Sequence, residues 1–191
     1  MDAKETIKKI FSDSMDAQKL FANDISQIAA VESVVRSIVD CYKRGGKVLI
    51  CGNGGSASDA QHMAAELVVR FEKDRQSLPC IALNSDTANL TAIGNDYGFS
   101  RVFSRQVEAF AIEGDVLIAI STSGNSPNIL EAAKAAKEKK AVVIALGGRD
   151  GGMLAPLADI CVIVKSENTG RIQEVHSTVI HAVCKLVEDA F

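Results

Sequence analysis

The sequence lacks the features that mark several common classes of protein. It has no run of lysine or arginine, and 21 basic against 24 acidic residues give a formal net charge of −3 at pH 7. A nucleic-acid surface needs a dense basic patch, so none is indicated. No apolar run approaches the roughly 18 residues of a membrane-spanning helix, and the first residues are charged. We therefore expect neither a membrane span nor a nucleic-acid partner.

The sequence also lacks a cysteine motif. Its five cysteines are odd in number and widely spaced, no two form a C-x-x-C pair, and several lie inside apolar runs. Cysteines of this kind behave as small buried apolar residues in a reducing compartment rather than as a disulfide framework. With no signal region at the start, we expect a cytoplasmic protein. The residues are Cys41, Cys51, Cys80, Cys161 and Cys184.

The remaining composition is that of one globular domain. Of the 191 residues, 47% are apolar and 24% are charged, and there is no low-complexity tract, linker or repeat. Five short apolar runs are continuous rather than alternating, and helical patterns separate them. Such runs are typical of parallel strands covered on both faces. We predict a single doubly wound α/β domain over residues 1–191. Its five-stranded parallel sheet has strands at residues 48–51, 79–83, 116–120, 141–146 and 160–164.

Residues 1–44 are predicted to be an N-terminal helical segment. Apolar residues recur at spacings of three to five over residues 6–28, and again over residues 31–42. The polar residues 12–14 allow an interruption of the first helix. A segment this apolar needs a surface to cover, and both its own sheet and a neighbouring subunit remain open.

A strand, a glycine-rich loop and a helix follow one another between Lys47 and Glu66. The loop, residues 52–56, precedes a helix expected at residues 60–67. This arrangement binds phosphate, because backbone N–H groups and the positive end of the helix dipole converge on the anion. A second loop rich in Ser, Gly and Asn, residues 121–126, follows another strand. Ligands bind at the carboxyl ends of parallel strands, so we expect both loops to face one crevice.

The first loop also matches a relaxed dinucleotide-binding pattern. Gly52, Gly54 and Ala57 have the spacing G-x-G-x-x-G/A, and Asp86 follows the next strand, where an acidic residue would hold a ribose. A nicotinamide enzyme would need no second phosphate loop at residues 121–126, and little chain remains for a substrate domain. We therefore disfavour this alternative.

Only three histidines are present, and two of them belong to a candidate site. His62 and Glu66 lie four residues apart on one face of the helix after the phosphate loop. Gln173 and His181 lie about two turns apart on the terminal helix. Two imidazoles, a carboxylate and an amide form a plausible ligand set for a divalent metal such as zinc. His176 faces elsewhere and is interpreted as structural.

Four stretches carry a resemblance to a known family. They are CGNGGSASDAQHMAAEL from Cys51, IGNDYGF from Ile93, GDVLIAISTSGNSPNIL from Gly114 and RIQEVHSTVIH from Arg171. Over nearly its whole length the chain is similar to the sugar isomerase (SIS) fold family. Within that family it resembles the isomerases of sedoheptulose 7-phosphate in bacterial heptose synthesis. The resemblance implies a homotetramer with active sites at subunit interfaces. It also implies a ketose–aldose isomerisation that yields D-glycero-D-manno-heptose 7-phosphate for lipopolysaccharide precursors.

The resemblance further implies roles for individual residues. Glu66 and His181 would form the acid/base pair, and one zinc ion per subunit would be held by His62, Glu66, Gln173 and His181. With Ser56 of the first loop added, the predicted substrate-binding residues are Asn53, Gly54, Gly55, Ser56, Glu66, Asn95, Asp96, Ser121, Thr122, Ser123, Ser126 and Gln173.

Two alternatives belong to other functional classes. A paralogue within the family binds the DNA replication initiator and is not an isomerase, and the stretches AQHMAA and TAIGND are close to that paralogue too. Its pattern lacks the carboxylate and the late histidine, whereas this chain has Glu66 and His181. A sugar-phosphate sensor would be expected to add a DNA-binding segment, for which little chain remains. The sequence therefore favours the enzyme.

Overall fold

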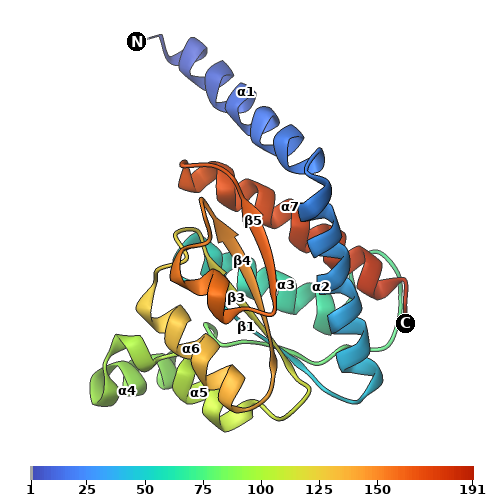
Figure 1. Cartoon of the computed structure of the whole chain (residues 1–191), viewed down its shortest axis with the longest axis vertical. Helices are drawn as coiled ribbons and strands as arrows, with labels where there is room; N and C mark the ends of the chain where they lie inside the picture. The colour runs from blue at the N-terminus through green and yellow to red at the C-terminus, as the bar shows by residue number, and fades with distance from the viewer. Residues whose placement is uncertain (1) are drawn as a thin grey trace.

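Five apolar segments form an all-parallel sheet at the centre of the molecule (Figure 1). The structure is a computed structural model that describes residues 2–191. The spatial order is β2-β1-β3-β4-β5, and every neighbouring pair is parallel. This confirms the predicted five-stranded parallel sheet. The strands are β1 (Val48–Cys51), β2 (Cys80–Ala82), β3 (Val116–Ser121), β4 (Val142–Gly148) and β5 (Ile160–Val164).

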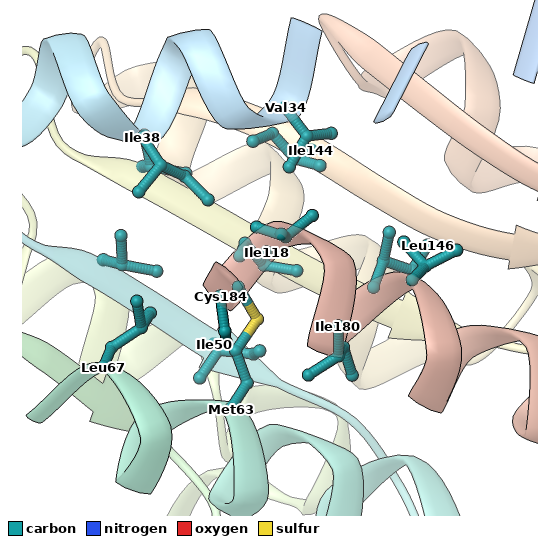
Figure 2. Close-up of a cluster of buried hydrophobic side chains, with 14 of the residues drawn as sticks. Val34, Ile38, Ile50, Met63, Leu67, Ile118, Ile144, Leu146, Ile180 and Cys184 are labelled. Atoms are coloured by element: carbon teal, nitrogen blue, oxygen red, sulfur yellow. The ribbon is translucent and has the colours of Figure 1, made fainter. Parts of the chain in front are cut away.

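Helices cover both faces of this sheet. Successive residues of a strand point to opposite faces, and the strands are apolar at successive positions, so both faces must be covered. Ile50 and Ile118 lie in one core cluster with residues of α2 (Ile25–Lys43), α3 (Gly55–Val68) and α7 (Thr169–Glu188), as Figure 2 shows. Leu49 and Leu117 lie in a second cluster. That cluster is completed by α5 (Ser104–Phe110), α6 (Pro127–Glu138) and the 3-10 helix η2 (Gly152–Leu157). Within residues 2–191, no helix is long and apolar enough to cross a bilayer.

The first helix, α1 (Ala3–Ala22), projects from the body of the protein (Figure 1). It has no buried residue, and it runs without the interruption that the polar residues 12–14 allowed. The chain bends at Asn23 instead, because Asp24 accepts hydrogen bonds from the N–H groups of Ser26 and Gln27 and so begins α2. It is α2 that packs on the sheet, whereas α1 touches α2 and α7.

The segment of residues 94–98, whose Gly, Asn and Asp residues predict a turn, is helical in its first four residues. It completes α4 (Thr87–Tyr97), which Asp86 begins by accepting a hydrogen bond from the N–H of Asn89 at 3.0 Å. Gly94 and Asn95 lower helix propensity, but they do not end a helix that is already capped. The helix ends at Gly98, where φ is +85°, and the 3-10 helix η1 (Phe99–Arg101) follows.

Asp115 joins the starts of β1 and β3. Its fully buried carboxylate accepts hydrogen bonds from the Lys47 N–H at 2.9 Å, from Lys47 Nζ at 2.6 Å and from the Ile112 N–H at 2.9 Å. A buried carboxylate is tolerated because every one of these bonds offsets part of its lost hydration.

Replacing Asp115 by Ala should lower the free energy of unfolding by about 2–4 kcal/mol, because two backbone N–H groups and the Lys47 ammonium lose their buried partner. Urea unfolding followed by circular dichroism measures this. The control is Lys140→Ala, which breaks an ion pair with Glu113 whose side chains are 71% and 73% exposed. It should cost less than about 1 kcal/mol. Equal costs for the two variants would contradict the role given to Asp115.

Candidate active site

The carboxyl ends of β1 and β3 lie side by side where the strand order reverses. From β1 the chain continues to β2 on one side, and from β3 it continues to β4 and β5 on the other, so a crevice opens between the loops. A pocket of about 270 Å³ occupies this position. It brings together most of the predicted substrate-binding residues. Its lining is Asn53, Gly54, Gly55, Ser56, Ile120, Ser121, Thr122, Ser126, Thr169 and Gln173.

The first wall of the pocket is the loop that leads into α3. The helix begins at Gly55, five residues earlier than predicted, so its N-terminal turn itself borders the pocket. This places the positive end of the helix dipole beside any bound anion. A Cβ atom on Gly55 would lie 2.5 Å from Nε2 of Gln173, so only glycine lets the Gln173 amide pack against this turn.

The second wall is the loop of residues 121–126, which a neighbouring loop holds in place. Gly124 has a φ of +65° and lies too close to the backbone of Gly151 to carry a Cβ atom. Its carbonyl oxygen accepts a hydrogen bond from the Leu154 N–H at 2.9 Å. The hydroxyl oxygens of Ser121 and Ser126, both pocket residues, lie 3.4 Å apart. The loop thus presents fixed hydroxyl groups to the pocket.

An amide pair connects the two sides of the crevice. Asn128, in the first turn of α6, donates from Nδ2 to Oδ1 of Asn53 at 2.8 Å, and Asn53 returns the same bond at 2.9 Å. The pair fixes which atom of the Asn53 amide faces the pocket. Sequence reasoning missed Asn128 as a site residue. The only local signal is its place directly after Pro127, and its partner is distant in sequence.

A second cluster forms where α3 packs against α7. Nε2 of His62 lies 3.1 Å from Oε1 of Glu66, and the rings of His62 and His181 meet edge-on with centroids 5.0 Å apart. Buried Asp59 of α3 accepts a hydrogen bond from the Ser177 hydroxyl of α7 at 2.9 Å. The structure therefore brings His62, Glu66 and His181 together within one chain, which the sequence alone did not establish. The side chains of His62 and Glu66 remain 44% and 23% exposed.

The predicted zinc ligands match zinc in their chemistry but are not assembled around one point. In residues 2–191, no three His, Cys, Asp or Glu side chains are arranged to hold a metal ion. His62 Nε2 is engaged with Glu66, and the Gln173 amide lies against Gly55 in the pocket. Two imidazoles, a carboxylate and an amide still form a ligand set of the kind zinc takes. Zinc binding stays a prediction.

Four predicted substrate-binding residues lie outside the lining of the pocket: Glu66, which belongs to the cluster between α3 and α7, and Asn95, Asp96 and Ser123. Asn95 and Asp96 are exposed on α4, where Nδ2 of Asn95 donates to Oδ1 of Asp96 at 2.8 Å. Ser123 belongs to the second loop, but its hydroxyl oxygen accepts a hydrogen bond from the Asn125 N–H at 3.2 Å. Their contacts with substrate stay predictions.

His176 has a structural position, as its placement on the helix indicated. It is fully buried, and its Nε2 lies 2.9 Å from the carbonyl oxygen of Gly147 at the end of β4. Burial lowers the pKa of this imidazole below its ordinary value, so the neutral form that donates to Gly147 is favoured.

Comparison with known proteins agrees with this geometry. A family model described as SIS domain matches residues 15–148. Phosphoheptose isomerase of Citrifermentans bemidjiense is 58% identical over 159 residues, which cover 83% of each chain. Phosphoheptose isomerase of Campylobacter concisus is 50% identical over 97% of this chain and 98% of its own. The structure of phosphoheptose isomerase from Neisseria gonorrhoeae aligns with a TM-score of 0.93 at 43% identity, covering 98% of this chain and 100% of that chain. The chain therefore belongs to the SIS domain family and, within it, to the phosphoheptose isomerases.

Proposed function

We propose that this chain converts sedoheptulose 7-phosphate to D-glycero-D-manno-heptose 7-phosphate. The supporting observation is that the two helices that border the phosphate-type pocket, α3 and α7, also carry Glu66 and His181. Gly55 and Glu66 lie about 16 Å apart along α3, and helix side chains lean toward the N-terminus. A long sugar phosphate is suited to bridge such a span, with its phosphate in the pocket and its carbonyl end beside Glu66.

The reaction moves a proton between two neighbouring carbons through an enediol. A carboxylate is a suitable base for a carbon-bound proton, and we assign this role to Glu66 at C1 and C2. His181 protonates and deprotonates the sugar oxygens. The pocket anchors the far end of the sugar, so that binding energy positions the reacting carbons.

We also propose a zinc ion held by His62, Glu66, Gln173 and His181. Such an ion would act as a Lewis acid that polarises the sugar oxygens and stabilises negative charge on them. Rotation of the Gln173 side chain away from Gly55 and of His62 away from Glu66 would be needed to gather the four ligands.

We also propose that the chain forms a homotetramer whose active sites lie between subunits. Helix α1 exposes Ile7, Ile10, Phe11 and Met15 at helical spacing, and these side chains are between 47% and 67% exposed in the single chain. A continuous apolar stripe of this kind is typical of a helix that packs against another subunit. The exposed positions of Asn95 and Asp96 also favour sites that neighbouring subunits complete.

In the cell, we place this isomerase in the cytoplasm, in the synthesis of heptose for lipopolysaccharide precursors. The alternative of an adaptor that binds the replication initiator is not favoured. Glu66 and His181, which that class lacks, are both present and lie on packed helices with His62 between them.

The function is tested by incubating the purified chain with sedoheptulose 7-phosphate and measuring aldose formation. Wild type should turn over, and Glu66→Gln should lower kcat by about 10²–10⁴-fold, because it removes the base but keeps the shape. KM should change little. Glu131→Gln is the control, because this α6 side chain is 33% exposed and pairs with Lys134; it should match wild type. Near-normal turnover by Glu66→Gln would overturn the assignment of the base.

Removal of metal should abolish turnover, and zinc should restore it. Metal analysis of the untreated protein should find about one zinc per chain, and zinc added to the stripped protein should raise its melting temperature, because a ligand that binds only the folded state stabilises it. Full activity of a protein in which analysis finds no zinc would contradict the metal proposal and leave the assignment of Glu66 untouched.

The substitution Phe11→Glu should dissociate the tetramer, because it places a charge within the apolar stripe of α1. Light scattering measures the mass of the assembly. Lys8→Glu adds the same side chain one turn away, at a position that pairs with exposed Glu5, and should leave the assembly intact. A wild-type chain that is monomeric at micromolar concentration would refute the proposed assembly.

A further inference from the structure

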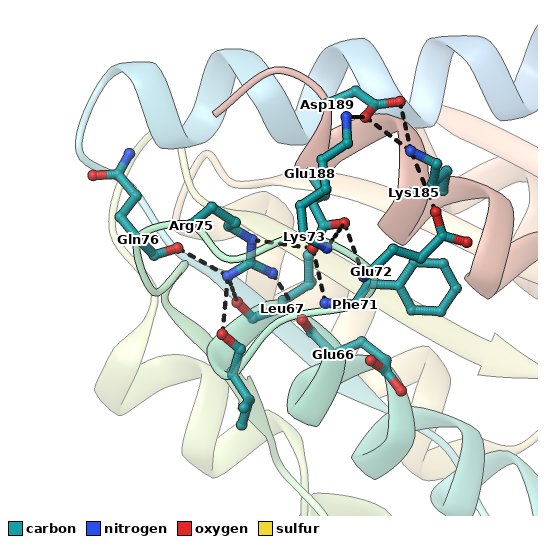
Figure 3. A network of polar contacts seen from close by, with 11 residues as sticks. Glu66, Leu67, Phe71, Glu72, Lys73, Arg75, Gln76, Lys185, Glu188 and Asp189 are labelled. Atoms are coloured by element: carbon teal, nitrogen blue, oxygen red, sulfur yellow. Dashed lines mark hydrogen bonds and ion pairs between the residues drawn. The ribbon is translucent and has the colours of Figure 1, made fainter.

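Residues 69–79 connect α3 to β2 and cross the C-terminal end of α7 (Figure 3). One carboxylate holds the beginning of this segment. Glu188 of α7 accepts hydrogen bonds from three successive backbone N–H groups, those of Phe71 at 2.8 Å, Glu72 at 2.9 Å and Lys73 at 2.8 Å. Its side chain is completely buried. Three donors on one buried carboxylate leave the backbone at Phe71 little freedom to move.

Arg75 holds the same segment from the other side. Its side chain is only 4% exposed, and its Nε lies 3.7 Å from Oε2 of Glu188. It donates from Nη2 to the carbonyl oxygen of Glu66 and from Nη1 to that of Leu67, both at 2.8 Å. The last carbonyl groups of a helix have no partner within it, so Arg75 satisfies those at the end of α3. The turn of α3 that carries Glu66 is thereby fixed.

The negative charge of Glu188 lies beside the positive charge of Arg75. Burial would raise the pKa of Glu188, but the three N–H groups and the charge of Arg75 outweigh this and hold the pKa below its usual range. Glu188 is therefore ionised at neutral pH, which is the form that accepts all three hydrogen bonds.

The cluster also determines what lies against His181. The ring of Phe71 stacks on the His181 imidazole, with centroids 5.6 Å apart and planes at 25°. The same imidazole also contacts the ring of His62, which meets it edge-on. Glu188 and His181 lie seven residues apart on α7, or about two turns, and so share one helix face. Helix α7 therefore carries His181 and, through Glu188, also positions the Phe71 ring that packs on His181.

We propose that residues 69–79 form a positioning strap for the active site, in which Glu188 and Arg75 fix the backbone so that Phe71 holds the His181 imidazole beside His62 and Glu66. Phe71, Arg75 and Glu188 are positioning residues, because each acts through Glu66 or His181. The proposal rests on the isomerase function proposed above. It predicts that changes in the strap reduce kcat more than they weaken substrate binding, because the phosphate pocket is built from other loops.

The test compares Phe71→Leu with Phe103→Leu in the isomerase assay. Both remove a phenyl ring, but Phe103 belongs to the core cluster on the opposite face of the sheet. Phe71→Leu should lower kcat by about 10- to 100-fold with KM changed by less than about threefold. Phe71→Tyr keeps the stacked ring and should restore kcat. Phe103→Leu should lower the melting temperature and leave kcat near that of wild type.

A double-mutant cycle tests whether Glu188 acts through Phe71. Glu188→Gln should lower kcat in the same direction as Phe71→Leu, and the double variant should be no slower than the slower single variant, since both changes remove one contact. Melting temperatures of all variants are measured beside the kinetics, and only variants that remain folded at the assay temperature are compared.

The outcomes separate this proposal from the function on which it rests. A wild-type chain without turnover would overturn the proposed function. An active wild type with unchanged kcat in Phe71→Leu would overturn the strap proposal alone. Equal losses of kcat in Phe71→Leu and Phe103→Leu, or no recovery in Phe71→Tyr, would also overturn it, because they would reflect stability rather than the stacked ring.

Discussion

The packing of α3 against α7 is the contact on which the active site depends. Met63 and Leu67 of α3 lie in the same buried cluster as Ile180 and Cys184 of α7, as Figure 2 shows, and both helices rest on one face of the sheet. Burying these side chains contributes about 1.5–3 kcal/mol for each large one. The apolar faces point inward, and the adjoining faces of the same turns carry His62, Glu66 and His181 to a shared position.

The sheet supplies the second half of the site through its strand order. Because β1 and β3 are neighbours and their connections leave in opposite directions, two polar loops meet without a helix between them. The pocket needs no Lys or Arg in its lining, since a helix N-terminus, backbone N–H groups and hydroxyl groups are sufficient donors for a phosphate. The Asn53–Asn128 pair holds the two sides of the crevice at a fixed separation.

Buried charges appear at the ends of elements, where backbone groups lack partners. Asp115 accepts the N–H of Lys47 just before β1, Glu188 accepts those of residues 71–73, and Arg75 donates to the carbonyl groups at the end of α3. Each charge thus forms hydrogen bonds with backbone N–H or C=O groups that have no partner within a helix or sheet. These contacts stabilise the fold and, for Glu188 and Arg75, also orient the residues of the site.

By itself the sequence determined the class of fold, the five strands to within two residues at their ends, and the shared face of His62 and Glu66. The strands follow from continuous apolar runs, and the shared helix face follows from the periodicity of 3.6 residues; both signals are local. Only the tertiary structure decided that His181 meets His62, that Asn128 pairs with Asn53, and that Glu188 holds the backbone at Phe71. These partners are far apart in the chain, and their meeting depends on how helices and loops pack on the sheet. The first helix shows the same limit, because its apolar pattern predicted a helix but left open which surface it covers.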